Sequence, residues 1–230
     1  MYYFAYGSNC NPVVMKRKGV DFSSRRRAVL RRYRLLFNKK AYRESLPDSI
    51  GFANINEDAD AIVEGVLYDI CDEHLELLDQ SERYPEHYGR IRVVVETDDG
   101  PIECFAYQAQ PDKLATGLVP SRNYLDHILA ADDFLSRQYY EALDQSQTYT
   151  GECACCHVGG EVVFLKDQDG MHTLCQPCRE SRIIWGNTLG RPLTVAETES
   201  VMTGLVKDSE GFPSIVALVR EAVARGLIVE

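Results

Sequence analysis

The 230-residue sequence predicts an α+β fold: a small mixed β-sheet or barrel with surrounding helices, followed by a small cysteine-containing module. Two observations carry this expectation. Segments typical of strands outnumber those typical of helices and form local hairpins rather than a regular alternation with helices, which favours a mixed sheet. Five of the eight cysteines then lie between Cys153 and Cys178, in a segment of different texture.

Six strands are expected in the first part of the chain. They lie at residues 2–6, 28–37, 50–55, 63–70, 90–96 and 102–107. Each is rich in the β-branched and aromatic residues that strands favour. Asp98-Asp99-Gly100 lies between the last two and predicts a hairpin turn.

Residues typical of helix N-caps predict where the helices of residues 1–148 begin. The expected N-caps are Asn11, Asp72, Ser121 and either Asp132 or Asp133. Pro12 suits the first helical position after Asn11, and Gly19 ends that helix. A polar stretch at residues 144–148 then ends the last helix, which predicts two domains, residues 1–148 and 149–230.

The composition, with 45% hydrophobic and 26% charged residues, is that of an ordinary globular protein. No apolar run is long enough to cross a bilayer, so no membrane partner is expected. The first residues lack the basic start and cleavage site of a secretory signal, which predicts a cytoplasmic location. In that compartment cysteines are expected as thiols or metal ligands rather than as disulfides.

Positive charge is concentrated in residues 16–43, which hold twelve Lys or Arg against Asp21 alone. The segment has three interpretations: a strand with a solvated basic face, an offset to the acidic stretch that follows, or contact with an anionic partner. The net charge of −10 for the whole chain argues against nucleic acid as that partner.

Glu82 occupies a position where the periodicity of its own segment predicts a hydrophobic residue. Leu75, Leu78 and Glu82 have the i, i+3, i+7 spacing of one helical stripe, so Glu82 is expected to point inward. Carboxylates desolvated in this way have raised pKa values, which suits them to general acid or base catalysis near neutral pH. In the alternative interpretation, Glu82 reaches solvent at a helix end or pairs with Arg83 or Arg90.

Two further motifs point to a ligand. Tyr6-Gly7-Ser8-Asn9 ends a strand in a glycine-containing turn before a helix, where backbone amides can bind a carboxylate or phosphate. A plain turn in which Asn caps the next helix would have the same sequence. Tyr88 returns toward the end of the Glu82 helix and could bind a substrate, or it could be an ordinary core or edge aromatic residue.

Together these motifs resemble the γ-glutamylcyclotransferase-like family, which includes the γ-glutamylamine cyclotransferases. The resemblance covers roughly residues 2–144 and rests on six short motifs in the right order. They are residues 4–9, Leu78-Asp79 with Glu82, Tyr88 with Arg90, and the segments 51–55, 63–68 and 120–128. The sequence departs from the family at Ala130-Ala131, where relatives often have Gly-Ala, and at Arg83, where they commonly have Gly.

The resemblance implies a small barrel whose pocket binds a γ-glutamyl amine or amino acid and releases 5-oxoproline, a lyase- or acyltransferase-type reaction. It makes Glu82 the general acid/base and assigns the substrate's α-carboxylate to the amides of residues 6–9. Tyr88 and Tyr139 would line the pocket. No cofactor is expected for catalysis. The alternative is a non-catalytic adaptor that retains a ligand in the barrel and recruits partners through the cysteine module.

The module contains two C-x-x-C pairs at the spacing of a four-thiolate zinc site. They are Cys153 with Cys156, and Cys175 with Cys178. Such a closed site would be structural. A redox pair is a second interpretation. The three residues that could replace one of the ligands are Cys155, His157 and His172.

The sequence of the cysteine module also predicts a hairpin and two helices. The hairpin spans residues 161–173, between the two pairs, and the helices span residues 194–206 and 214–227. These helices could pack on the barrel, cover its pocket or form a homodimer contact. The net charge of −4 over residues 149–230 again disfavours nucleic acid.

Overall fold

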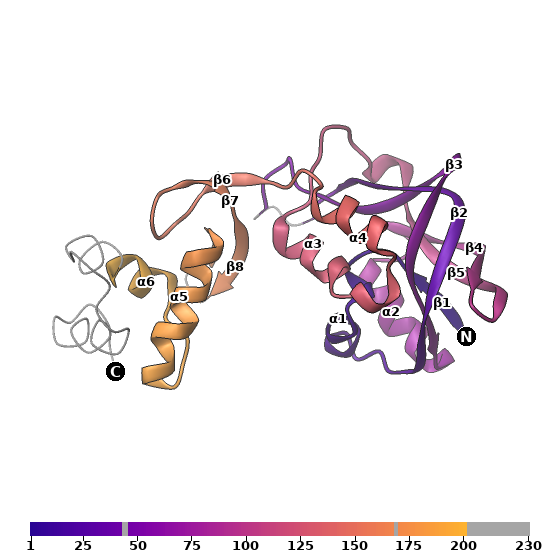
Figure 1. The fold of residues 1–230 in the computed structure, drawn as a ribbon, viewed down its shortest axis with the longest axis horizontal. Coiled ribbons are helices and arrows are strands. Elements are labelled where there is room, and N and C mark those ends of the chain that lie inside the picture. Colours follow the sequence, from indigo (N-terminus) through magenta and orange to yellow (C-terminus); the bar gives the residue numbers. More distant parts are fainter. Residues whose placement is uncertain (43–45, 168–169, 202–230) are drawn as a thin grey trace. The chain divides into compact units, whose positions relative to one another are not determined.

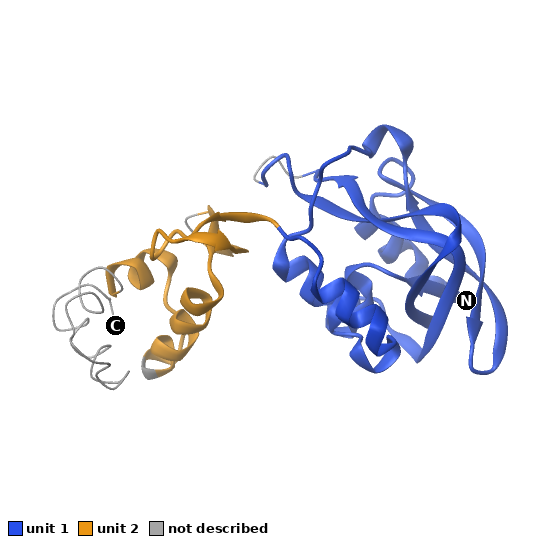
Figure 2. Ribbon diagram, turned by 45° about the horizontal axis from the view of Figure 1, so that its top comes forward, with its two compact units in different colours: residues 1–148 blue, residues 149–230 orange. Residues whose placement is uncertain are grey.

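The computed structural model describes residues 1–42, 46–167 and 170–201. Contacts divide the chain into two compact units, residues 1–148 and 149–230 (Figure 2). Within the described residues, no helix is both long and apolar enough to span a membrane.

Residues 1–148 contain a closed five-stranded barrel with strand order β1-β3-β2-β4-β5 (Figure 1). The strands are β1 (Tyr2–Ala5), β2 (Phe22–Lys40), β3 (Gly51–Ile70), β4 (Tyr88–Thr97) and β5 (Gly100–Ala109). Neighbouring strands are antiparallel except β1 and β5, which pair in parallel and close the barrel. The predicted small mixed barrel is confirmed, as is the hairpin turn before Gly100.

Strand β3 replaces the two separate strands expected at residues 50–55 and 63–70. The intervening polar residues continue the ladder with β2, where Tyr33 pairs with Glu57. Arg32, with φ 65, lies at a register shift in β2, as in a β-bulge. The middle of this long hairpin is largely exposed, so its polar sequence lacks the apolar pattern that marks a strand.

Four of the eight basic side chains of β2 are paired with acidic side chains of the same barrel. The ion pairs are Arg26–Asp99, Arg27–Glu64, Arg31–Glu96 and Arg34–Asp58, at 3.2, 3.6, 2.7 and 2.6 Å. The offset interpretation of this segment therefore accounts for these arginines without an anionic partner.

The barrel has a hydrophobic cluster on each side of its wall. Alternate residues of β1 point to opposite sides, so that Phe4 and Tyr6 join a cluster drawn from all five strands, which fills the interior. Tyr3 and Ala5 join the second cluster, which includes Leu78 and Leu125 from the surrounding helices. This second cluster fixes the helices against the barrel.

Four α-helices surround the barrel: α1 (Pro12–Arg17), α2 (Leu75–Glu82), α3 (Arg122–Leu129) and α4 (Arg137–Asp144). Four short 3-10 turns complete this unit: η1 (Ser8–Cys10), η2 (Asp72–His74), η3 (Pro111–Lys113) and η4 (Asp132–Phe134). Asn11 caps α1 as predicted, since its side chain accepts a hydrogen bond from the amide of Val13 at 2.9 Å. Helix α2 follows η2 directly.

The predicted start of α4 is wrong. Asp132 and Asp133 lie in η4, and Ser136 is the N-cap whose hydroxyl accepts from the amide of Tyr139. The buried carboxylate of Glu64 fixes this cap, because it accepts from the Ser136 amide at 2.6 Å and from its hydroxyl at 2.7 Å. A contact between residues far apart in sequence therefore decides where the helix begins.

The second unit contains four short strands and two helices within its described residues. They are β6 (Thr150–Glu152), β7 (Gly159–Glu161), β8 (Val163–Asp167), β9 (Gly170–Leu174), α5 (Gln176–Gly186) and α6 (Val195–Val201), with a 3-10 turn η5 (Asn187–Leu189). Strands β8 and β9 form the predicted hairpin, and α5 is a helix that the sequence analysis did not predict. Helix α6 begins near the expected residue 194, whereas residues 202–206 and the helix expected at 214–227 lie outside the described residues.

Candidate active site and metal centre

A small pocket of about 30 Å³ is lined by Glu82, by residues 6–9 and by Tyr88. These residues come from the end of α2, from the turn after β1 and from the start of β4. Except for Tyr139, the structure therefore brings together all of the residues that the sequence analysis proposed for catalysis and substrate binding. Four residues complete the lining and were not proposed: Tyr3, Ala53, Tyr107 and Tyr124.

Glu82 is the last residue of α2, and its side chain is only 16% exposed. Its oxygen Oε1 accepts hydrogen bonds from Asn9 Nδ2 at 2.9 Å and from Lys18 Nζ at 2.8 Å. Lys18 also donates to Asn9 Oδ1 at 2.7 Å, so the three side chains form a closed triangle. Within the described chain the second carboxylate oxygen, Oε2, makes no hydrogen bond, which leaves it available to a ligand.

Lys18 is the charged partner of Glu82, where the sequence analysis considered Arg83 and Arg90. A lysine just before Gly19 is typical of a helix C-terminus, so its sequence gives no sign of a role in the pocket. Arg90 instead approaches Asp79 at 3.6 Å, and Asp79 accepts a hydrogen bond from the Tyr107 hydroxyl at 2.6 Å. The expectation that Glu82 lies inward is correct, but its surroundings are polar.

The turn at residues 7–9 approaches the wall of the pocket closely. A side chain at Gly7 would place its Cβ 3.1 Å from the Tyr124 hydroxyl and 3.3 Å from Ala53 Cβ. The 3-10 turn η1 is closed by the amides of Cys10 and Asn11, which donate to the carbonyls of Gly7 and Ser8. The amides that precede them have no partner within such a turn, and they are suited to bind an anion.

Tyrosine hydroxyls hold the pocket wall together. The Tyr88 hydroxyl donates to the carbonyl of Ala53 at 2.9 Å, and the Tyr124 hydroxyl accepts from the amide of the same residue at 3.1 Å. Tyr6 donates to the carbonyl of Tyr107, and the Tyr3 hydroxyl accepts from Asn9 Nδ2 at 2.8 Å. Burial raises the pKa of the Tyr6 and Tyr88 hydroxyls well above the usual value, so both remain neutral hydrogen-bond donors.

Arg83 ends α2 in the left-handed conformation, with φ 52 and ψ 45. Glycine adopts this conformation without strain, whereas an arginine requires compensation. One compensating contact is present, because the guanidinium lies 4.1 Å from the centroid of the Tyr42 ring.

Tyr139 is not brought to this pocket. It lies in the first turns of α4 and lines a separate surface groove together with Leu36 and Pro120. The start of α4 at Ser136, which Glu64 fixes, directs this helix onto the outside of β2 and β3. The assignment of Tyr139 to substrate binding is therefore withdrawn.

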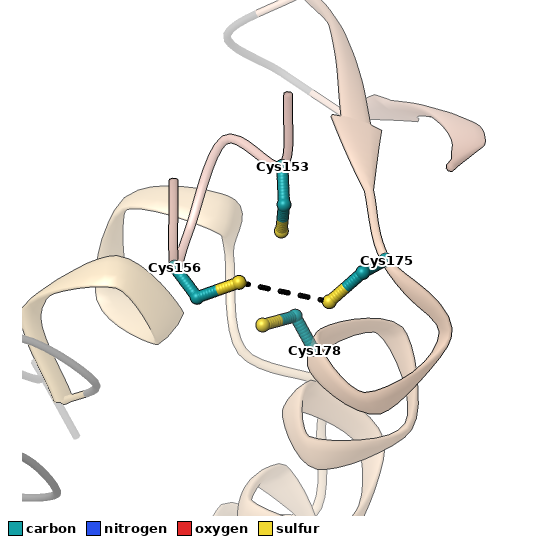
Figure 3. Close-up of side chains that lie close together, drawn as sticks. All are labelled: Cys153, Cys156, Cys175 and Cys178. Atoms are coloured by element: carbon teal, nitrogen blue, oxygen red, sulfur yellow. Dashed lines mark hydrogen bonds between the residues drawn. The ribbon is translucent and has the colours of Figure 1, made fainter. Parts of the chain in front are cut away.

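The second unit groups the four predicted cysteines. The sulfur atoms of Cys153, Cys156, Cys175 and Cys178 all lie within 4.8 Å of one another, and those of Cys156 and Cys175 are 3.7 Å apart (Figure 3). Four sulfurs placed tetrahedrally around zinc at 2.3 Å would be about 3.8 Å apart. The geometry fits a closed metal site that is formed by the turn after β6 and by the start of α5.

The alternative ligands have other partners. Cys155 is buried and its thiol contacts the carbonyl of Val195 at 3.6 Å. His157 contacts Glu152 and Glu199, and His172 contacts Asp167 at 2.8 Å. Within the described chain none of the three belongs to the group of four sulfurs.

Comparison with solved structures supports the fold of the first unit. A structure described as a gamma-glutamyl cyclotransferase is 26% identical, with a TM-score of 0.57, over 66% of this chain and 92% of that one. An uncharacterized protein from Homo sapiens is 27% identical, with a TM-score of 0.54, over 66% and 91% of the two chains. YkqA from Bacillus subtilis is 26% identical, with a TM-score of 0.56, over 65% of this chain and 56% of that one.

Comparison with curated proteins gives no match. The sequence model of one family, described as "Gamma-glutamyl cyclotransferase, AIG2-like", matches residues 3–126, more than half of the chain. That range includes the turn at residues 6–9, Glu82 and Tyr88, which the structure places around one pocket. The chain therefore belongs to the gamma-glutamyl cyclotransferase, AIG2-like family.

Proposed function

We propose that this protein is a γ-glutamyl cyclotransferase, which converts a γ-glutamyl amine or amino acid into 5-oxoproline and the free amine. The observation that carries this proposal is the position of Glu82. Its carboxylate lies in one pocket with the turn at residues 6–9 and is 2.9 Å from the side chain of Asn9. An acid/base group and an anion-binding turn are the two elements that this chemistry needs.

Glu82 transfers the proton in both halves of the reaction. The substrate's α-ammonium first gives a proton to the carboxylate, and the free amine then attacks its own γ-carbonyl carbon. As the bond between that carbon and the leaving nitrogen breaks, Glu82 returns the proton to the departing amine. It then accepts the second proton that the ring nitrogen must lose, and this proton passes to the released amine, which leaves as its ammonium form. Oε2 is the oxygen for this transfer, because Asn9 and Lys18 already bind Oε1.

The remaining groups position the substrate. Backbone amides of residues 7–9 bind its α-carboxylate, and Gly7 lets the substrate approach the backbone closely. Tyr88, fixed to Ala53 by its hydroxyl, forms one wall of the pocket. Alignment of the amine with the carbonyl can account for about 7 to 11 kcal/mol of the barrier, more than proton transfer alone supplies.

Release of 5-oxoproline from a panel of γ-glutamyl amines and amino acids tests the proposal. We expect turnover by the native protein and a loss of about 100-fold to 10,000-fold in kcat for Glu82→Gln, because the amide cannot carry the proton. Glu76→Gln is the matched control, since Glu76 is exposed on the same helix. Equal turnover by Glu82→Gln would overturn the catalytic role of Glu82, whereas ligand binding without any product in the native protein would favour the non-catalytic adaptor.

The second unit holds a structural zinc ion in this proposal. Cys153, Cys156, Cys175 and Cys178 supply the ligands, which leaves no open position for a substrate. The ion stabilises residues 149–201, and catalysis in residues 1–148 proceeds without it. Metal analysis of the purified protein should give one equivalent of zinc.

A further inference from the structure

Lys39, near the end of β2, is a buried cation without an acidic partner. Its side chain is 2% exposed, and no ion pair joins it to a carboxylate within the described residues. Burying a charge without a counter-ion is unfavourable, and unpaired lysines are rarely found in protein interiors. The position of Lys39 therefore needs an explanation beyond packing.

Among the described residues, the Lys39 ammonium group has oxygen or nitrogen acceptors for two of its three N–H groups. Nζ donates to the carbonyl of Lys40 at 2.8 Å and to Nδ1 of His87 at 3.1 Å. An ammonium group has no lone pair, so Nδ1 must be the acceptor and His87 is neutral in this pair. The ring centroids of Tyr42 and Tyr88 lie 5.6 and 5.5 Å from Nζ.

A second cation without a carboxylate partner in the described chain lies beside Lys39. The Arg83 guanidinium packs on the Tyr42 ring, which also lies near the Lys39 ammonium group. Burial, together with the positive charges of Arg83, Lys113 and Lys40, lowers the pKa of Lys39 to about 8 against the opposing effect of Glu82. Of these cations, Lys113 is paired with Asp112 at 2.8 Å. Lys39 and Arg83 thus form a local excess of positive charge.

This excess of charge adjoins the Glu82 pocket. Tyr88 lines that pocket and also contacts Lys39, and Arg83 follows Glu82 directly in the sequence. The turn at residues 6–9, to which we assign the substrate's α-carboxylate, contributes none of these cations. Lys39 and Arg83 are therefore available to a different part of the substrate.

We propose that Lys39 and Arg83 form an anion subsite that binds a carboxylate on the leaving amine, so that the protein prefers γ-glutamyl amino acids to γ-glutamyl amines without an acid group. A carboxylate there would supply the missing counter-ion and accept the unpaired N–H of Lys39. Tyr42, whose ring centroid lies 5.6 Å from the ammonium group, and Arg83 are both exposed, so the subsite lies next to solvent. The inference rests on the proposed function and deepens it.

The test compares two substrates that differ only in the carboxylate, γ-glutamylglycine and γ-glutamylmethylamine. The native protein should show the higher kcat/KM with γ-glutamylglycine. Lys39→Met should reduce this ratio about tenfold or more, because one charge-assisted hydrogen bond is lost. Arg83→Gln, at an exposed position, should reduce it in the same direction. Lys16→Met removes an exposed lysine of α1 and serves as the control with an unaltered ratio.

Three outcomes separate the subsite from the proposed function. No 5-oxoproline from either substrate with the native protein overturns the proposed function. Turnover of both substrates with a ratio that neither Lys39→Met nor Arg83→Gln changes overturns the subsite alone. A loss of activity toward both substrates in equal proportion shows that the two residues act on the fold or on the γ-glutamyl group, and it also overturns the subsite.

Discussion

The barrel and the cysteine module are stabilised in different ways. In the barrel, two extensive clusters of fully buried aliphatic and aromatic side chains lie on the two sides of the wall. In the module, a buried cluster of the described residues consists of three cysteines with Val163, Leu174 and Val195. In our proposal the module is stabilised in addition by the zinc ion that its four sulfurs hold.

This contrast matches what each unit does in our proposal. A catalytic pocket needs walls that keep Glu82 and the turn at residues 6–9 in fixed positions relative to each other. The barrel provides such walls through packing spread over many side chains and through tyrosine hydrogen bonds. The described strands of the module are short, with three to five residues each, as is common in small metal-stabilised segments. The two units should therefore respond very differently to the same kinds of change.

Loss of a zinc ligand should have the largest effect. Cys178→Ala should release the metal and unfold the module, because metal binding can contribute on the order of 10 kcal/mol to the folding of a small zinc domain at neutral pH. Release of 5-oxoproline should persist, since the pocket lies wholly in residues 1–148. Zinc content, circular dichroism and turnover of the same sample provide the measurement.

Cys155→Ala is the matched control for that experiment. Cys155 is also buried in the module, but its thiol contacts the Val195 carbonyl rather than the other sulfurs. It should keep one equivalent of zinc. Loss of zinc in Cys155→Ala with retention in Cys178→Ala would show that the ligand set is wrong.

A core truncation in the barrel should have an intermediate effect. Leu78 is fully buried on α2, one turn before Glu82, so Leu78→Ala should lower the free energy of unfolding by about 2 to 5 kcal/mol. Leu77→Ala is the control, because Leu77 is 38% exposed on the same helix. Denaturant unfolding monitored by fluorescence measures both. Equal losses for the two variants would contradict the packing described for α2.

The features that the sequence predicts are those set by local pattern. Asn11 caps α1 because its side chain and the amide of Val13 are two residues apart. Glu82 is conspicuous because a carboxylate interrupts an apolar stripe, and the two C-x-x-C pairs have a spacing that few other sites share. Each of these signals requires only neighbours along the chain.

The features that the sequence does not predict depend on distant residues. Lys18 joins Glu82 across 64 positions, and Glu64 fixes the start of α4 across 72. The length of β3 depends on its pairing with β2, because its exposed central residues have no apolar alternation. The assignment of Tyr139 to the pocket came from the family resemblance, and the structure places this residue in a different groove.

Lys39 should make the stability of the barrel depend on pH. The pKa of Lys39 is lowered in the folded protein to about 8 from its usual 10.5. Between these values the unfolded chain holds a proton that the folded chain has released, so the stability of the fold rises with pH in this range. Urea unfolding at about pH 7.5 and about pH 9.5 should show this rise in the native protein and a smaller rise in Lys39→Met. A rise of the same size in both would show that Lys39 is not its source.

Removal of the α1 cap should have the smallest effect. Asn11→Ala deletes the acceptor of the Val13 amide and should lower the free energy of unfolding by about 1 kcal/mol. Asn11→Asp keeps an acceptor at the same place and should lower the free energy of unfolding by less. Because Lys18 follows the last residue of α1 and binds Glu82, fraying of this helix should also lower kcat slightly. A loss of stability with unaltered kcat would show that the cap does not affect catalysis. The Lys18–Glu82 contact would then not require an ordered start to α1.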